Sequence, residues 1–159
     1  MSSKKGRYML DVTTEWGQHA EQRLRSNIIA WLTTVGSDGR PYTAPVWFLW
    51  DGNTILIFSQ PQKQKIRNLR KNARVTLALD DTKQGDDVVI VEGTAELLDN
   101  PEISVMLPAY VAKYGALIQN MGWKPSRRGT GATNIVQNGE VQRLRRIGDS
   151  LPTRSHPRQ

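Results

Sequence analysis

The strongest indication of fold class in this chain is the run Ile28-Ile29-Ala30-Trp31-Leu32-Thr33-Thr34-Val35-Gly36-Ser37-Asp38-Gly39. Its first part is rich in β-branched and aromatic residues, which favours a strand, although Ile28 could instead end a preceding helix. The Asp-Gly pair then marks a hairpin turn. A return strand is predicted over 41–50, and after a second turn a third strand covers 54–59. Three strands joined by short turns predict an antiparallel meander.

Two helices and two strands are predicted around this meander from the spacing of their apolar residues. The helices cover about 14–27 and 61–71, and the strands cover 74–80 and 88–98. Pro61 suits the first position of its helix. Gly93 is expected to interrupt its strand with a bulge.

A third helix is predicted from Asn100-Pro101-Glu102, which combines an N-cap residue, a proline and an acid in the first turn. Apolar residues then repeat at helical spacing from Ile103 to Leu117. Pro108 should kink this helix or split it in two. We expect the helix to pack against the core or against another subunit.

The chain divides into one domain and two flanking segments. Its 159 residues suit an arm at 1–13, a domain at 14–123 and a basic tail at 124–159. The tail holds eight Lys or Arg and two acids, hence six of the seven net positive charges, whereas all eleven aromatic residues lie at or before Trp123. We expect most of the tail to be weakly ordered. Binding to nucleic acid would depend on this tail alone, so we rank that function last.

The composition excludes several functional classes. The chain has no cysteine, so disulfides, thiolate metal sites and cysteine nucleophiles are absent. His19 and His156 are its only histidines, which leaves little for a metal site or a catalytic triad. No apolar run approaches the roughly 18–20 residues of a membrane helix, and the charged start lacks the apolar core of a secretory signal. We therefore expect a cytoplasmic protein without a metal site.

One strand–helix junction combines features that suit an anion. The strand end Phe58-Ser59 is followed by Gln60, Lys63 and Lys65 at the start of the predicted helix. A helix N-terminus presents unpaired N–H groups and a partial positive charge, which suit phosphate. The lysines add full charge and Ser59 adds a hydroxyl donor. The ligand that would suit this junction is a phosphate ester, but these residues by themselves favour the alternative, a solvated basic helix face.

The run Pro45-Val46-Trp47-Phe48-Leu49-Trp50 is unusually aromatic for a strand. Trp47 and Phe48 point to opposite faces, so one could line a site for a flat ring while the other is core. Plain core or dimer packing is the alternative. No pair of residues indicates acid–base or nucleophilic chemistry, which suggests that a cofactor carries any reaction.

These segments together resemble a known family. The matching segments, in order, are Trp31–Val35, Asp38-Gly39, Pro45–Phe48, Phe58-Ser59, Lys65–Arg70, Asn72–Val75 and Val91–Glu96. They resemble the pyridoxamine 5′-phosphate oxidase-like split β-barrel superfamily, and most of all its class-B flavin/deazaflavin oxidoreductases, which mostly use coenzyme F420. The resemblance covers roughly residues 14–123. It implies a mainly β (α+β) fold, a six-stranded antiparallel split β-barrel with flanking helices.

The resemblance also implies a homodimer with two cofactor sites at the subunit interface. The residues implied to contact the flat ring are Pro45, Val46 and Trp47. Those implied at the phosphate are Phe58, Ser59, Gln60, Gln64 and Lys65, with Asn68 and Arg70 as weaker members. Lys63 and Lys71 would favour the cofactor's anionic oligoglutamate tail. The implied reaction transfers a hydride from the reduced deazaflavin to an electrophilic carbon of a conjugated small molecule, and no catalytic side chain is assigned.

Two departures from the family bear on these expectations. The FMN-using oxidases carry an Arg-rich strand where this chain has Pro45-Val46-Trp47, which favours F420 over FMN as the cofactor. The family also closes its barrel with a strand after the last helix, and residues 124–159 do not supply a convincing one. A frameshift near codon 124 is one hypothesis for this composition. With a native tail, 134–137 or 141–147 must form the closing strand.

Two further functions compete with the F420-dependent reductase. One is an FMN-binding oxidoreductase on the same fold, which the spectrum of the bound chromophore would distinguish. The other is a non-catalytic binder of a flavin, haem or tetrapyrrole, since a fold does not specify a function.

Overall fold

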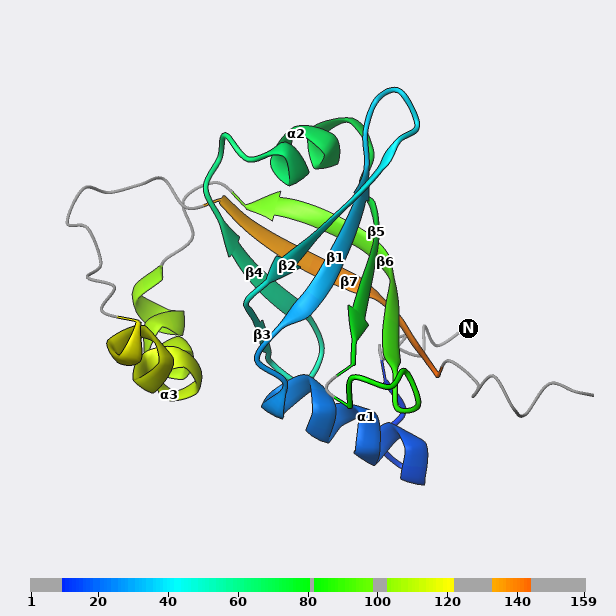
Figure 1. The fold of residues 1–159 in the computed structure, drawn as a ribbon, viewed down its shortest axis with the longest axis vertical. Helices are drawn as coiled ribbons and strands as arrows, with labels where there is room; N and C mark the ends of the chain where they lie inside the picture. The colour runs from blue at the N-terminus through cyan, green and yellow to red at the C-terminus, as the bar shows by residue number, and fades with distance from the viewer. Residues whose placement is uncertain (1–9, 81, 99–102, 122–132, 144–159) are drawn as a thin grey trace, which may run out of the picture.

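The computed structural model of the chain describes residues 10–80, 82–98, 103–121 and 133–143. A strongly curled antiparallel sheet lies at its centre, with helices at its ends and side (Figure 1). The elements in chain order are α1 (Glu15–Ser26), β1 (Ala30–Val35), β2 (Pro41–Val46), β3 (Phe48–Trp50), β4 (Ile55–Ser59), α2 (Gln64–Lys71), β5 (Arg74–Leu79), β6 (Val89–Leu98), α3 (Ile103–Asn120) and β7 (Thr133–Arg143). The predicted fold class, mainly β with flanking helices, is confirmed.

The strands follow the order β2-β1-β5-β6-β7-β4-β3 in one sheet. The two edge strands, β2 and β3, are successive in the chain and only Trp47 separates them. The predicted return strand at 41–50 is thus divided, because its first part pairs with β1 and its second part with β4. This division accounts for seven strands among the described residues, where six were expected.

Strand β7 lies in the predicted tail and pairs on both sides. It forms ladders with β4, where Ile55 is opposite Gln137, and with β6, where Val89 is opposite Arg143. Residues 133–143 therefore form a strand after the last helix although their composition is not convincing for one, and they include 134–137, one of the two segments expected to form it. Two neighbouring strands satisfy the β7 backbone, so its pairing does not depend on a β-rich composition. The remainder of the tail and residues 1–9 of the predicted arm lie outside the described residues.

Three local predictions differ from the structure. Helix α2 begins at Gln64, because a bond from the Lys63 N–H to the Gln60 carbonyl (3.2 Å) closes a turn around Pro61. Gly93 pairs in regular register with both neighbouring strands, so no bulge forms there. Pro108 lies in the second turn of α3, which continues as one helix, so the helix is not split there, and the predicted kink stays a prediction. The proline removes one i→i−4 bond, to the carbonyl of Ser104 near the start of the helix.

The core lies inside the curled sheet and under α1 and α2. In β1 and β5 alternate residues are buried, and the helices contribute Ala20 and Leu24 from α1 and Ile66 and Leu69 from α2. Figure 1 shows α1 and α2 at opposite ends of the sheet. Burying each leucine or isoleucine side chain contributes about 1.5–3 kcal/mol, so both helices are held by apolar packing. None of the helices described is long and apolar enough to cross a membrane.

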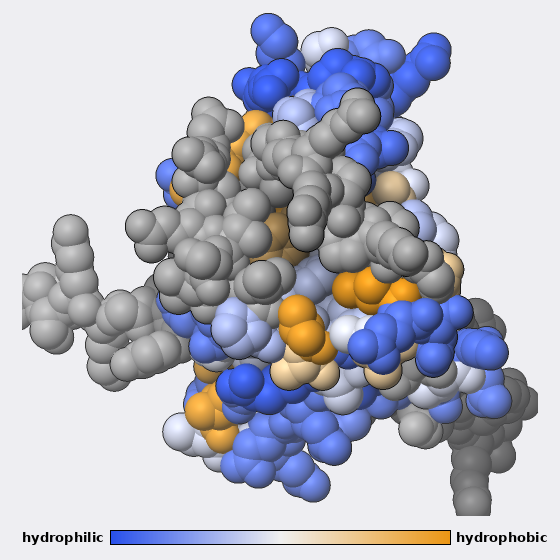
Figure 2. Space-filling model, turned by 90° about the vertical axis from the view of Figure 1, so that its left-hand side faces the viewer, coloured by the Kyte–Doolittle hydropathy of each residue, from blue (hydrophilic) through white to orange (hydrophobic). Residues whose placement is uncertain are grey.

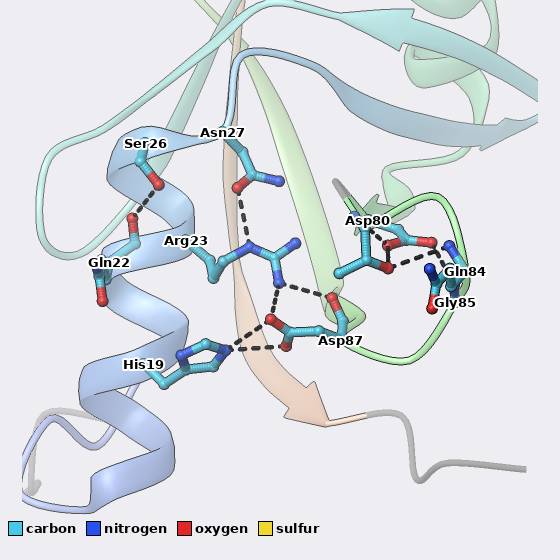
Figure 3. Close-up of polar contacts among 10 residues, drawn as sticks. His19, Gln22, Arg23, Ser26, Asn27, Asp80, Gln84, Gly85 and Asp87 are labelled. Atoms are coloured by element: carbon cyan, nitrogen blue, oxygen red, sulfur yellow. Dashed lines mark hydrogen bonds and ion pairs between the residues drawn. The ribbon is translucent and has the colours of Figure 1, made fainter.

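A charged cluster ties α1 to the loop between β5 and β6 (Figure 3). The Arg23 guanidinium, only 7% exposed, lies 2.6 Å from the Asp87 carboxylate and donates to the Asp87 carbonyl and to Asn27. His19 Nε2 lies 2.9 Å from Asp87 Oδ1. Burial would raise the pKa of Asp87, but the His19 hydrogen bond and the Arg23 charge hold it below its usual value. His19 lies at the surface and has a structural partner in Asp87.

Candidate cofactor site

The two segments predicted to hold a cofactor lie side by side at one rim of the sheet. The β3–β4 pairing places Phe48 opposite Ile57, so Trp47, just before β3, is the neighbour of Phe58 near the end of β4. Both rings are half-buried, and both contact Tyr110 of α3, with centroid distances of 6.3 Å from Trp47 and 5.0 Å from Phe58. The fold therefore brings the predicted ring-binding strand next to the predicted phosphate-binding strand end.

The other two residues of the predicted ring-binding segment face different ways. Val46 is buried and belongs to the core. Pro45 is exposed on β2, where it pairs with Trp31 of β1. Of the three residues predicted beside the ring, Trp47 is therefore the one with a flat aromatic side chain that is partly accessible. Pro45 is exposed on the outer face of β2.

The start of α2 is an uncapped, electropositive helix end. Its N-cap residue Lys63 makes no side-chain capping bond, and the first turn contains no acid. Lys63 and Gln60 are exposed, whereas Lys65 is half-buried. Burial, and then the charge of Lys63, lower the pKa of Lys65. Such an end attracts an anion, because the unpaired backbone N–H groups of a helix start and the charges of two nearby lysines all favour negative charge.

The positive charge continues beyond the helix start. Residues 52–79 contain no acid, and their six Lys or Arg residues are Lys63, Lys65, Arg67, Arg70, Lys71 and Arg74. All of them except Lys65 are exposed. Figure 2 shows hydrophilic side chains gathered at the upper end of the molecule, where Figure 1 places α2. Within the part of the chain that the structure describes, no acid forms an ion pair with these six residues. This surface suits an extended anion.

Three predicted phosphate-binding side chains make bonds within the protein. The buried Asn68 amide donates to Thr34 Oγ1 (3.0 Å) and accepts from the half-buried Gln64 (2.8 Å), so it joins α2 to β1. The side chain of Gln64 also accepts a bond from Arg67. The buried Ser59 hydroxyl donates to the Gln60 carbonyl (3.2 Å). The cations and backbone of α2, rather than these amides and hydroxyl, are therefore the groups left for a ligand.

Helix α3 contributes an aromatic cluster to the site. Trp47 stacks on Tyr114 with a centroid distance of 4.6 Å and an angle of 3°, while Phe58 meets Tyr110 edge-on. The stack covers one face of the Trp47 ring. The sequence pattern predicts a packing role for α3 but not its contact with Trp47 and Phe58. The available signal was the spacing of Tyr110 and Tyr114, which places both rings on one helix face.

The polar groups of α3 meet the backbone where β3 begins. The Phe48 N–H donates to the Tyr114 hydroxyl oxygen (2.9 Å), and that hydroxyl lies 2.8 Å from the Ile28 carbonyl and 3.1 Å from the Phe48 carbonyl. Lys113 donates to the Phe48 carbonyl (3.0 Å), and its ammonium lies 3.8 Å from the centre of the Phe48 ring. Burial lowers the pKa of Lys113 to about 8 and raises the pKa of Tyr114 to about 12. The Tyr114 hydroxyl therefore keeps its proton at neutral pH.

The donor set at α2 fits the phosphate of a nucleotide-like cofactor. An uncapped helix start, two lysines and the absence of acids from the segment favour an anion over a cation. Trp47 provides a flat ring beside Phe58, and Phe58 precedes Lys63 by five residues in the chain. No group of three metal-ligating side chains occurs among the described residues, which gives no support to a metal centre there.

Comparison with solved structures identifies the same fold. An F420 reductase is 24% identical, with 75% of this chain and 91% of that chain covered and a TM-score of 0.62. A conserved hypothetical protein from Mycobacterium tuberculosis is also 24% identical, with 94% and 95% covered and a TM-score of 0.62. A haem storage protein from Vibrio cholerae is 15% identical, with 82% and 91% covered and a TM-score of 0.58. At these identities the likeness shows a shared fold.

Family comparison is more specific. No curated protein matches the sequence. The model of the pyridoxamine 5′-phosphate oxidase family matches residues 17–135. That match contains the meander, the start of α2, helix α3 and the first residues of β7. The chain is therefore a member of the pyridoxamine 5′-phosphate oxidase family, as the sequence resemblance predicts.

Proposed function

We propose that this protein is an F420-dependent oxidoreductase that acts on a conjugated small molecule. The observation that carries the proposal is the uncapped, acid-free start of α2, with Lys63 and Lys65, next to the aromatic pair Trp47 and Phe58. This arrangement supports a cofactor with a phosphate at one end and a flat ring at the other. The likeness to an F420 reductase supports the deazaflavin among such cofactors.

Each part of the site has a role in this proposal. The N–H groups at the start of α2, with Lys63 and Lys65, hold the phosphate. Lys71 and the other cations of residues 52–79 favour an anionic oligoglutamate tail. Trp47 orients the ring, and the aromatic side chains around it exclude water. When bound, the reduced deazaflavin supplies the hydride, so the chain needs no nucleophile of its own.

The alternatives have weaker support. FMN has the same phosphate, but Pro45-Val46-Trp47 stands in place of the Arg-rich strand of FMN-using oxidases. The haem storage protein of Vibrio cholerae supports a haem-binding function only through its fold. The one histidine within the described residues, His19, is hydrogen-bonded to Asp87, in the loop that follows β5. Its ring is thus engaged in a structural contact between α1 and that loop.

A homodimer with cofactor sites at its interface belongs to the same proposal. Strand register places Pro45, Trp31, Ala78 and Ile90 in one row across the outer face of β2, β1, β5 and β6. Trp31 is 51% exposed there. A large apolar side chain exposed in such a row supports contact with a second copy of the chain. Light scattering should give the mass of a dimer, and a monomer would contradict this part of the proposal.

The first experiment is a titration of the purified protein with F420 and, in parallel, with FMN, followed by tryptophan fluorescence. Trp47 is close to the proposed ring site, so its emission should be quenched on binding. We expect F420 to bind at micromolar concentration or below and FMN to bind more weakly. Binding of FMN alone would favour the FMN oxidoreductase, and binding of neither would contradict the proposed function.

A further inference from the structure

Two neighbouring side chains of α3 form hydrogen bonds with the backbone of the edge strand β3 at its first residue. Strand β3 is an edge strand, so the side of it that faces away from β4 has no strand partner in the described sheet. At Phe48 the N–H donates to the Tyr114 hydroxyl, and the carbonyl accepts from Lys113. Side chains of a helix therefore take the place that a neighbouring strand would occupy.

The Tyr114 hydroxyl also connects two parts of the chain that the sheet does not join. It lies 2.8 Å from the Ile28 carbonyl, which precedes β1, and 2.9 Å from the Phe48 nitrogen, at the start of β3. Trp47 lies between the two edge strands, and its ring is parallel to the Tyr114 ring. One residue thus holds both the backbone after Trp47 and the plane of the Trp47 ring.

Tyr110 provides a contrast on the same helix. Its ring contacts Trp47, Phe58 and Tyr114, so it belongs to the same aromatic cluster. Its side chain is half-buried, whereas Tyr114 is fully buried. Within the described residues, the bonds to the backbone at Phe48 come from Tyr114 and Lys113 and not from Tyr110.

We propose that Tyr114 is a positioning residue for the ring end of the proposed cofactor site. Its hydroxyl fixes the backbone at Phe48, and its ring covers one face of Trp47, so a planar ligand meets Trp47 on the remaining face and at a defined angle. Tyr114 acts through Trp47 and does not contact the reacting atoms. The inference rests on the proposed function, and it adds the residue that sets the geometry of that site.

The test compares Tyr114→Phe with Tyr110→Phe. Each variant removes one hydroxyl and keeps the ring, so the aromatic cluster is preserved and both proteins should fold. Loss of a buried hydrogen bond at Tyr114 should raise the dissociation constant for F420 about tenfold. Tyr110→Phe should raise it by less, because the ring that contacts Trp47 remains and the bonds to Phe48 come from Tyr114 and Lys113. Lys113→Met removes the bond from the Lys113 ammonium to the Phe48 carbonyl. It should also raise the dissociation constant for F420, but by less than Tyr114→Phe.

A second readout separates positioning from a general loss of stability. Exchange of the Phe48 amide hydrogen, followed by NMR in the protein without cofactor, should accelerate in Tyr114→Phe and not in Tyr110→Phe. The near-ultraviolet circular dichroism of Trp47 should change in the same variant, with Trp47→Phe identifying its contribution.

The outcomes distinguish the two proposals. Wild-type protein that binds neither F420 nor FMN would contradict the proposed function. Wild-type binding with equal affinities in Tyr114→Phe and Tyr110→Phe would contradict the role of Tyr114 alone. Unchanged exchange of the Phe48 amide hydrogen in Tyr114→Phe would also contradict that role.

Discussion

Helices α1 and α2 close opposite ends of the sheet, and their N-termini have opposite chemistry (Figure 1). At α1 the Thr14 hydroxyl accepts a bond from the Gly17 N–H (2.9 Å), and Glu15 lies in the first turn. At α2 the N-cap residue is Lys63, which makes no side-chain cap, and no acid follows it in the first turn. A lysine at this position disfavours the helix, because it places positive charge next to the positive end of the helix dipole.

The cationic side chains of the two helices also differ in whether acids pair with them. Arg23 is paired with Asp87, and Arg25 with Glu21 at 2.8 Å. Around α2, the segment 52–79 carries six cations and no acid. The α1 end pairs its arginines with acids, whereas residues 52–79 around α2 offer no acid to their cations. The contrast supports a structural role for the α1 end and the proposed anion site at the α2 end.

Breaking the ion pair at the α1 end should have the largest effect. Asp87→Asn removes the carboxylate that lies 2.6 Å from the buried Arg23 guanidinium, and the expected loss of unfolding free energy is about 3 kcal/mol. Urea denaturation of both proteins measures this difference. Asp86→Asn is the matched control, since Asp86 is an exposed neighbour, and it should change stability by less than about 0.5 kcal/mol. Equal effects of the two variants would show that the Arg23–Asp87 pair is not structural.

Removing a cation at the α2 end should weaken cofactor binding. Lys65→Ala is expected to reduce the binding free energy of F420 by roughly 1.5 to 3 kcal/mol, the scale of a charge-assisted hydrogen bond. Isothermal titration calorimetry measures the loss. Lys83→Ala removes the same charge from the exposed loop between β5 and β6 and should leave the affinity unchanged. Unchanged affinity in Lys65→Ala would remove the phosphate site from the start of α2.

Changing the N-cap residue of each helix tests the contrast between a structural helix start at α1 and a ligand-binding helix start at α2. Thr14→Ala should destabilise the protein by about 1 kcal/mol, because the Gly17 N–H loses its acceptor. Lys63→Ser should do the reverse at α2, with a gain of about 0.5–1 kcal/mol from the new cap and a weaker affinity for F420. Thermal unfolding and the fluorescence titration measure the two quantities. A Lys63→Ser protein that gains stability and keeps its affinity would contradict a ligand role for this helix end.

Low pH should weaken the contribution of the Arg23–Asp87 ion pair to stability. The pKa of Asp87 is lowered in the folded protein, so its stabilising effect is complete above the unfolded value of about 3.9 and is lost as the pH falls through the folded value. Protonation of Asp87 removes the same negative charge that Asp87→Asn removes. The difference in stability between wild type and Asp87→Asn should therefore shrink as the pH falls from 6 toward 3 in urea denaturation. A constant difference across that range would mean that the Asp87 carboxylate is not the source of the effect.

The meander and the helices could be predicted because their signals are local. Asp38-Gly39 specifies a hairpin turn, and the alternation of residues in β5 specifies its buried face. The phosphate end of the candidate site was predictable for the same reason, since a strand end, a turn and two lysines are contiguous in the chain. Lys63 at the N-cap is visible in the sequence, but its place as the N-cap required the observed start of α2 at Gln64.

Long-range contacts account for what the sequence pattern missed. Strand β7 has a weak strand composition, and its pairing with both β4 and β6 provides the backbone partners that it needs. The division of the return strand at Trp47 depends on β1 and β4 being separate partners. The frameshift hypothesis concerns the gene and stays a prediction, as does the homodimer.

Local pattern thus established the strand segments before α3, the helices and the positive start of α2, because turns, alternation and capping depend on residues within a few positions of each other. Folding in three dimensions established the stack of Tyr114 on Trp47, the bonds from α3 to Phe48 and the ion pair of Arg23 with Asp87. Each of these joins residues more than sixty positions apart. The geometry of these contacts depends on how the whole sheet curls. The periodicity of residues along the chain does not specify that curl.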